Sequence, residues 1–246
     1  MAETYTAQEY ALGYPDGIET HFWHIARHHA LLRALKTLRI KDQLILDVGC
    51  GVGITTRFLH DQGFNIRGIE QGDAPVPEPS RTYITTRQDL FDMTAAQKQD
   101  VTCVLLLDVL EHMADREGFL TELQRQLPNC QTLVLTVPAR RELWGEFDRF
   151  WGHQLRYDRP TLAGELSRCG FTVQRISYYF HLVYLAGLLL KTLRVNRSKA
   201  FSSPRKSWPL SLLHRLLGLY GRLENRLIPG FIPGSSILCV ATRSPC

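Results

Sequence analysis

Three glycines stand at alternate positions in LILDVGCGVGITTRFL, residues 44–59. Gly49, Gly51 and Gly53 follow an apolar run and precede a helical pattern, and backbone without Cβ atoms can turn sharply and approach a ligand closely. The spacing G-x-G-x-G differs from the G-x-G-x-x-G of dinucleotide-binding turns, and the Lys and Ser/Thr of a P-loop are missing. Asp47, just before the turn, disfavours a pyrophosphate and favours a cationic ligand.

Carboxylates follow at the ends of later apolar segments. Glu70 ends the segment 64–69, Asp89 stands in RQDL, and Asp108 follows the most apolar segment, 101–107. A carboxylate can accept two hydrogen bonds from neighbouring hydroxyls. Because ligands of an open parallel sheet bind outside the carboxyl ends of its strands, we expect Glu70 and Asp89 to flank the glycine turn.

LDVGCGVG resembles motif I of the class I S-adenosylmethionine-dependent methyltransferases, whose cofactor carries a sulfonium cation and an amino acid tail but no phosphate. The resemblance covers about residues 40–180 plus the last strand. It implies that Glu70 takes both ribose hydroxyls and that Asp89 accepts from the adenine amino group. It implies a cofactor site made of Asp47, Gly49, Cys50, Gly51, Gly53, Glu70, Gln71, Asp89, Leu90 and Asp108.

The segment DVLEHMAD, residues 108–115, resembles the D-x-x-E-H signature after the fourth strand of quinone and other small-molecule methyltransferases in this superfamily. Glu111 and His112 can be a helix N-terminal cap and a satisfied histidine, and the resemblance favours a structural or cofactor-side role for them. His112 is not assigned as a base. The sequence analysis predicts no metal site.

The loop after the fifth strand, LWGEFDRFWGHQLRY, supplies candidates for the acceptor side. It resembles a pattern of bacterial family members acting on saccharide or lipid precursors. His153 is the candidate general base, since an imidazole accepts a proton near neutral pH. The candidates for substrate binding are Trp144, Asp148, Arg156 and Tyr157. Two alternatives stay open: His153, Arg156 and Tyr157 form a structural cluster around Asp148, or Arg156 clamps an anionic acceptor.

The elements that must position these groups alternate between strand and helix, which predicts an α/β fold with a seven-stranded, mostly parallel, Rossmann-like sheet and helices on both faces. The expected units are an N-terminal helical cap over 1–40, a cofactor-binding core over 41–180, a basic helical insertion over 181–232 and a final core strand over 233–246. The expected strands are 44–48, 64–69, one ending near Asp89, 101–107, 132–137, 171–179 and 236–242, and the expected helices are 21–38, 53–62, 116–127 and 161–168.

The segment ETHFWHIARHH, residues 19–29, spans the start of the predicted early helix, 21–38. Trp23, His24 and Arg27 lie on or near one face, as a lid over cofactor or substrate would. For His28 and His29, an amphipathic helix with a solvated histidine face is the favoured interpretation.

Basic residues gather in one segment. Between His181 and Ile228 there are nine Lys or Arg and one acid, which gives this segment a net charge of +8. Because the whole chain has a net charge of +5, the rest of the chain has a net charge of −3. Pro209 to Ile228 places leucines on one stripe and basic residues away from it, which is typical of a helix lying in an anionic membrane interface. The alternative is that these helices form a lid packed over the acceptor pocket. A membrane-bound helix and a lid are compatible if the acceptor is a lipid-linked molecule. The Leu-rich character argues against nucleic acid.

Six cysteines without a CxxC pair predict reduced, buried thiols and no disulfide framework. The sequence analysis predicts neither a signal peptide nor a transmembrane helix, so we expect a cytoplasmic protein, free or peripheral on the inner face of a membrane.

The predicted function is methyl transfer from S-adenosylmethionine to an oxygen of a small-molecule or lipid-linked acceptor. A nucleic-acid methyltransferase would need a target-base motif such as N-P-P-Y where DVLEH stands, and the intact glycine and acidic motifs disfavour a non-catalytic S-adenosylmethionine-binding membrane protein.

Overall fold

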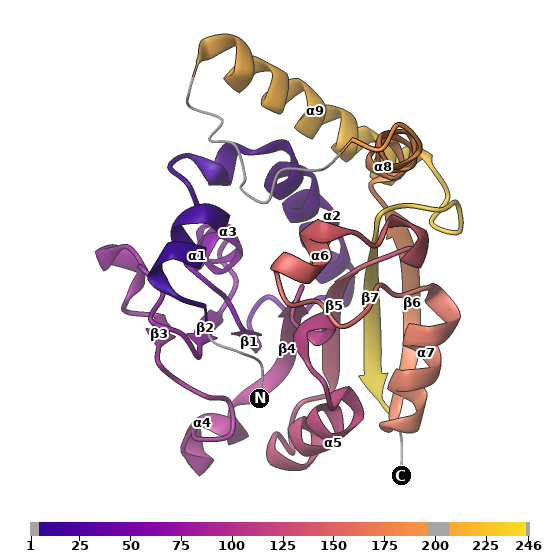
Figure 1. Ribbon diagram of the computed structural model, residues 1–246. Coiled ribbons are helices and arrows are strands. Elements are labelled where there is room, and N and C mark those ends of the chain that lie inside the picture. Colours follow the sequence, from indigo (N-terminus) through magenta and orange to yellow (C-terminus); the bar gives the residue numbers. More distant parts are fainter. Residues whose placement is uncertain (1–4, 196–206, 245–246) are drawn as a thin grey trace.

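The computed structural model describes residues 5–195 and 207–244, so part of the predicted insertion and Cys246 lie outside the described residues. Seven strands form one sheet in the order β3-β2-β1-β4-β5-β7-β6 (Figure 1). The strands are β1 Leu44–Val48, β2 Ile66–Glu70, β3 Ile84–Thr86, β4 Val101–Leu107, β5 Thr132–Pro138, β6 Phe171–Tyr179 and β7 Ser236–Arg243. β7 runs antiparallel to both β5 and β6, and the pairs from β3 to β5 are parallel. The predicted fold is confirmed.

The helices of the described residues are α1 Ala7–Gly13, α2 Phe22–Leu38, α3 Ile54–Asp61, α4 Ala95–Gln99, α5 Arg116–Gln126, α6 Glu146–Phe150, α7 Arg159–Arg168, α8 His181–Thr192 and α9 Trp208–Leu227. α5 and α7 pack on one face of the sheet, where Leu120 and Leu162 join the core. α2 and α3 pack on the other face through Leu31 and Leu59. Both faces of the central strands are therefore buried, which explains their continuous apolar runs.

The segment between β6 and β7 leaves from the edge of the sheet that carries the glycine turn. Tyr179, at the end of β6, pairs with Ser236, at the start of β7, and Ser236 also pairs with Pro138 at the end of β5. α8 and α9 therefore emerge beside the carboxyl ends of the parallel strands (Figure 1). Among the described helices, none combines the length and apolar character needed to cross a membrane.

The prediction of a solvated histidine face on α2 is wrong for His28. His28 is buried and stacks on Phe58 of α3, with ring centroids 4.3 Å apart, and its Nε2 lies 3.2 Å from the Thr55 hydroxyl. Burial, together with the nearby charge of Arg27, lowers the pKa of His28 to about 3. This histidine is a neutral core residue because α3 packs against α2 at this position.

Candidate active site

The three glycines between β1 and α3 all have left-handed backbone conformations, with φ of 71° at Gly49, 56° at Gly51 and 77° at Gly53. A Cβ atom at Gly53 would come within 2.2 Å of Ile84, and one at Gly51 within 2.4 Å of the Tyr14 hydroxyl. Side chains are excluded at this turn by backbone conformation as well as by space. The turn can therefore present bare backbone to a ligand.

Glu70 lies beside this turn, as the order of the strands requires. Its Oε2 accepts a hydrogen bond from the backbone N–H of Gly51 (2.7 Å), and its Oε1 accepts one from the backbone N–H of Gly72 (2.9 Å). Because β2 is the parallel neighbour of β1, the end of β2 meets the start of the turn. The predicted meeting of this carboxylate with the glycines is present in the structure.

Aromatic side chains of α1 and of Tyr14, the residue after it, cover the turn, and no sequence pattern predicts this contact. Tyr10 is buried and its hydroxyl lies against Gly72, while the Tyr14 hydroxyl lies over Gly51. The two rings stack with centroids 6.2 Å apart. The Tyr14 side chain fills part of the space in front of Gly51, where a ligand on this turn would contact it.

Asp47, the last polar group of β1 before the turn, is almost completely buried. Its Oδ2 accepts a hydrogen bond from the Thr56 hydroxyl (2.6 Å), and its Oδ1 has no hydrogen-bond partner. Burial raises the pKa of Asp47 to about 6, against the opposing effects of the Thr56 hydrogen bond and of Arg27. A buried carboxylate with a free oxygen favours a cationic partner.

Replacing Asp47 by asparagine is expected to stabilise the protein in a pH-dependent way. Because folding raises the pKa from 3.8 to about 6, the stability that protonated Asp47 contributes is complete below pH 3.8 and is lost as pH rises through 6. The variant should match the parent near pH 4 and exceed its free energy of unfolding by about 3 kcal/mol at pH 8. Urea denaturation across this range measures the difference, and equal stabilities at pH 8 would contradict the assignment.

The remaining residues of the predicted cofactor site lie around the turn. Asp89 accepts hydrogen bonds from the Gln71 side chain and from the backbone N–H of Phe91. The Cys50 sulfur packs against the position of Gly68, and the side chain of Leu90 is buried in the core. Gln71 and Asp89 are thus paired next to Glu70, whereas the buried Leu90 side chain is not available to a ligand.

Asp108, at the end of β4, has a left-handed backbone with φ of 60° and forms an ion pair with Arg27 of α2 (2.5 Å). Arg27 also donates to the Thr55 hydroxyl (3.0 Å) and stacks over the Trp23 ring at 4.1 Å. α2 is therefore an internal helix: His24 and Arg27 are buried, and Arg27 contacts the residue that follows β4. The Arg27–Asp108 pair was not predicted, because nothing in the sequence places α2 against the end of β4.

The loop after β5 brings a second group of polar side chains together. The Asp148 carboxylate is buried; its Oδ1 lies 2.9 Å from Nδ1 of His153 and 2.8 Å from Nε of Arg156, and its Oδ2 accepts from the backbone N–H of Gly145 (3.0 Å). Burial alone would raise the pKa of Asp148, but the hydrogen bonds from His153 and Arg156 lower it. With Nδ1 of His153 bound to this carboxylate, Nε2 is left to accept a proton.

Two substrate-binding predictions have no support in the geometry of this loop. Tyr157 is fully buried and its hydroxyl donates to Glu165 of α7 (3.3 Å), so it lies in the core and not in the Asp148 cluster. The Arg156 side chain is 5% exposed and donates through Nε to Asp148 and through one terminal nitrogen to the Ala139 carbonyl, so its contacts hold the loop together. Trp144 is half-buried, and its carbonyl accepts from Lys191 of α8 (3.3 Å).

Glu111 and His112, in the 3₁₀ turn Leu110–His112, face His153. Ligand atoms of these three residues lie within 4.8 Å of one another. Glu111 is completely buried and neither of its carboxylate oxygens has a hydrogen-bond partner. Burial, reinforced by Asp108, raises the pKa of Glu111 well above its usual range, and burial beside His153 lowers the pKa of His112 to about 4. No sequence pattern predicts this cluster, because His153 is 41 residues from His112.

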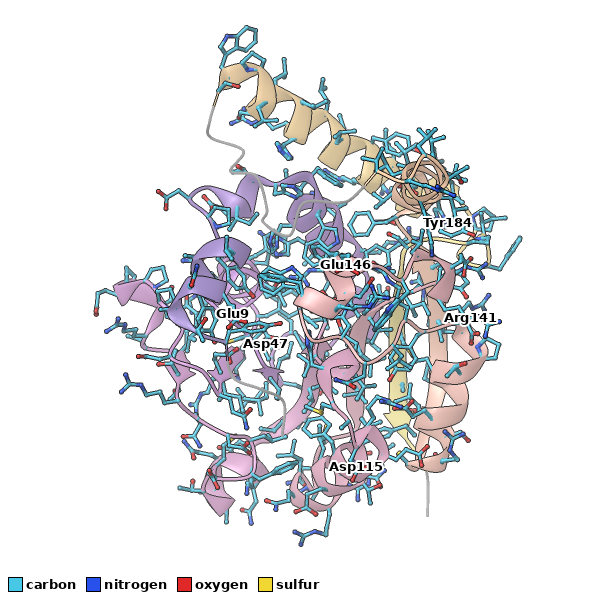
Figure 2. All side chains as sticks on the ribbon, in the orientation of Figure 1. Glu9, Asp47, Asp115, Arg141, Glu146 and Tyr184 are labelled. Atoms are coloured by element: carbon cyan, nitrogen blue, oxygen red, sulfur yellow. The ribbon has the colours of Figure 1, made fainter. Side chains whose placement is uncertain are left out.

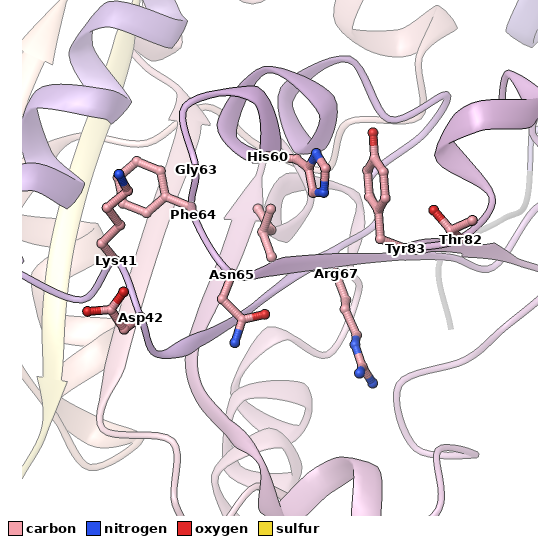
Figure 3. A pocket seen from close by; sticks show the side chains of 10 residues that line it. Lys41, Asp42, His60, Gly63, Phe64, Asn65, Arg67, Thr82 and Tyr83 are labelled. Carbon is pink, nitrogen blue, oxygen red and sulfur yellow. The ribbon is translucent and has the colours of Figure 1, made fainter.

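A separate depression of about 600 Å³ lies between residues 41–42 and the start of β2 (Figure 3). His60 and Tyr83 stack there with ring centroids 4.0 Å apart, and Lys41 and Arg67 are exposed beside it. It opens at the amino ends of β1 and β2, the opposite edge from the glycine turn. The groups described above therefore form a separate site.

Comparison with known proteins agrees with this site. A family model described as a methyltransferase domain matches residues 22–176. A ubiquinone biosynthesis O-methyltransferase of Azorhizobium caulinodans is 32% identical over 145 residues, covering 56% of this chain and 54% of that protein. Its namesake from Saccharophagus degradans is 33% identical over 86 residues, covering 31% of this chain and 36% of that one. The chain thus spans about half, or less, of the length of these curated relatives.

Solved structures share the fold at low sequence identity. The magnesium protoporphyrin IX methyltransferase of Synechocystis PCC 6803, with bound SAH, has a TM-score of 0.51 and 16% identity, covering 93% of this chain and 85% of that one. The 1,6-didemethyltoxoflavin-N1-methyltransferase of Burkholderia thailandensis has a TM-score of 0.53 and 14% identity, covering 90% and 78%.

Proposed function

The chain belongs to the methyltransferase domain family of class I S-adenosylmethionine-dependent enzymes, and we propose that it methylates an oxygen of a small-molecule or lipid-linked acceptor. S-adenosylmethionine supplies a methyl group on a sulfonium, so the protein's main tasks are to align donor and acceptor and to exclude water. The curated relatives carry the name O-methyltransferase, which supports an oxygen as the acceptor atom.

The residues around the glycine turn fit this cofactor. Side chains are excluded at Gly51 and Gly53, and Glu70 stands at the rim with two oxygens that can accept from a cis-diol. Asp47 supplies a buried carboxylate with a free oxygen for the cationic part of the ligand. These residues would hold the cofactor, and Tyr10 and Tyr14 would close over it.

One observation carries the acceptor assignment: His153 is held through Nδ1 by the buried Asp148 carboxylate, close to the end of β4. A base oriented in this way can take the proton of an acceptor hydroxyl as the methyl group is transferred. The test compares a hydroxylated aromatic acceptor carrying an isoprenoid tail with its amino analogue, measuring release of S-adenosylhomocysteine and the mass of the product. Methylation of the amine alone would contradict an oxygen acceptor.

A second role for His153 is favoured by the unpartnered oxygens of Glu111. A divalent cation held by Glu111, His112 and Nε2 of His153 would satisfy these oxygens. Asp148 would orient His153 for that purpose, as carboxylates commonly orient metal-binding histidines. The cation would act as a Lewis acid that favours the ionised acceptor hydroxyl.

Removal of divalent cations separates the two roles of His153. If a cation is held there, dialysis against EDTA should reduce turnover about tenfold, and Mg²⁺, Mn²⁺ or Zn²⁺ should restore it. Glu111→Gln should abolish the response to metal and leave S-adenosylmethionine affinity unchanged. Turnover that is insensitive to EDTA would leave His153 as a base only.

A further inference from the structure

Within the described residues, large hydrophobic side chains are exposed on α8, on α9 and in the segments that adjoin them. We call the exposed apolar side chains of these two helices, together with Leu193 directly after α8, the leucine face; its main members are Leu189, Leu193, Leu213, Leu216, Leu223 and Leu227. Leu216 is 56% exposed and Leu227 77%. Figure 2 shows side chains standing out from both helices beyond the body of the protein. An apolar surface of this extent marks an interaction site.

α9 exposes its leucines because a row of small residues faces α2. Gly218 and Gly221 are buried, and an added Cβ atom would come within 2.8 Å of Ile25 and 2.7 Å of Ala26. Side chains that point to the opposite side of the same helix must therefore point away from α2. Figure 1 shows α9 lying outside α2.

Glu224 of α9 fixes the same orientation through a contact with the start of α8. It is buried on α9 and accepts hydrogen bonds from the backbone N–H groups of His181 and Leu182, which satisfies the start of α8. α9 is thus held by a glycine contact at α2 and a carboxylate contact at α8. The exposed leucines of α9 therefore lie on the side of the helix that faces away from α2.

A cationic cleft of about 410 Å³ lies between α2, β6 and α9. Its basic side chains are Arg33, Lys36, Arg175, Arg222 and Arg226, and no acidic residue lines it. Within the described part of the chain, no ion pair involves any of these five. Arg222 and Arg226 stand beside Leu223 and Leu227 on α9, so the cleft adjoins the leucine face. Such a cleft fits the phosphates of anionic lipids.

We propose that the leucine face and the cationic cleft together dock this protein on an anionic phospholipid bilayer. The apolar side chains of α8 and α9 enter the interface while lipid phosphates pair with the arginines of the cleft. The charge of this segment favours an anionic bilayer as the partner. Glu224 is the only acid between residues 181 and 228, and it is buried, so the exposed charges of the segment are basic. The proposal concerns binding and is independent of the acceptor that the enzyme methylates.

A second copy of the chain is the competing occupant. A symmetric contact through α9 would bring the exposed Arg215, Arg222 and Arg226 of both copies toward one another, and no exposed acid on this helix would compensate them. Like charges across an interface oppose association. A lipid surface offers the opposite charge.

Co-sedimentation with vesicles tests the proposal on the full chain. The protein should sediment with vesicles of phosphatidylglycerol and phosphatidylcholine in equal parts, less so as salt rises, and not with phosphatidylcholine alone. Leu216→Ser with Leu223→Ser should weaken binding about tenfold, and Arg222→Glu with Arg226→Glu at least as much. All four side chains are exposed, and thermal unfolding followed by circular dichroism verifies that the variants fold.

The matched control is Lys41→Glu with Arg67→Glu, which changes the net charge equally at exposed positions near the opposite edge of the sheet. This control should bind vesicles within about twofold of the parent. An equal loss in the control and in the α9 charge variant would overturn the proposal, as would failure of the parent to sediment. A dimer in light scattering that the leucine variant dissociates, without vesicle binding, would assign the face to a second copy.

Discussion

Replacing Glu70 by alanine should weaken the binding of S-adenosylmethionine by at least about a hundredfold. The carboxylate is placed to accept two charge-assisted hydrogen bonds, each contributing about 1.5 to 3 kcal/mol. Its present partners are the backbone N–H groups of Gly51 and Gly72, so its loss also releases the turn that must hold the ligand. Isothermal titration calorimetry of parent and variant measures the change.

Two further variants show whether this effect belongs to the site. Glu70→Gln keeps the size of the side chain without its charge and should fall between parent and alanine variant. Glu78→Ala removes an exposed carboxylate that pairs with Arg81, and its affinity should equal that of the parent. An affinity of Glu70→Ala within about threefold of the parent would remove Glu70 from the cofactor site.

The second large effect is expected at His153. His153→Ala should reduce turnover about a hundredfold while S-adenosylmethionine affinity stays unchanged, because a positioned base contributes about 10² to 10⁴ in rate. The residue stands apart from the glycine turn, in the loop that carries Asp148. Steady-state turnover and calorimetry on the same preparations give the two quantities.

The control for His153 is His60→Ala, since His60 lies beside Asp61 and Tyr83 at the opposite edge of the sheet. Asp148→Asn should reduce turnover less than His153→Ala does, because the imidazole remains but loses the carboxylate that orients it. Parent-like turnover in His153→Ala would reject both the base and the metal-ligand roles.

Features with local physical causes could be predicted from the sequence. The apolar runs of β1 and β4 are buried on both faces, and the glycines between β1 and α3 have the left-handed conformations that their type permits. The predicted helix 21–38 begins at Phe22 after His21, and the final strand extends from Ser236 to Arg243. In each case the pattern lies within one segment, so the local sequence determines the structure and contacts with distant segments do not alter it.

The remaining features depend on contacts between distant segments. Tyr157 belongs to the core because α7 places Glu165 beside it, and His28 is buried because α3 supplies Phe58. The stripe of leucines on α9 is visible in the sequence, but its outward direction depends on two glycines that meet α2. The unpartnered oxygens of Glu111 could not be read from a motif, since burial and pairing are properties of the folded chain.

Calorimetric titration of the unmodified protein with S-adenosylmethionine, and in parallel with NAD, tests the cofactor assignment most directly. We expect one molecule of S-adenosylmethionine to bind per chain, with no binding of the dinucleotide at the same concentration. Absence of S-adenosylmethionine binding, or tighter binding of NAD, would contradict the account of the glycine turn and its carboxylates.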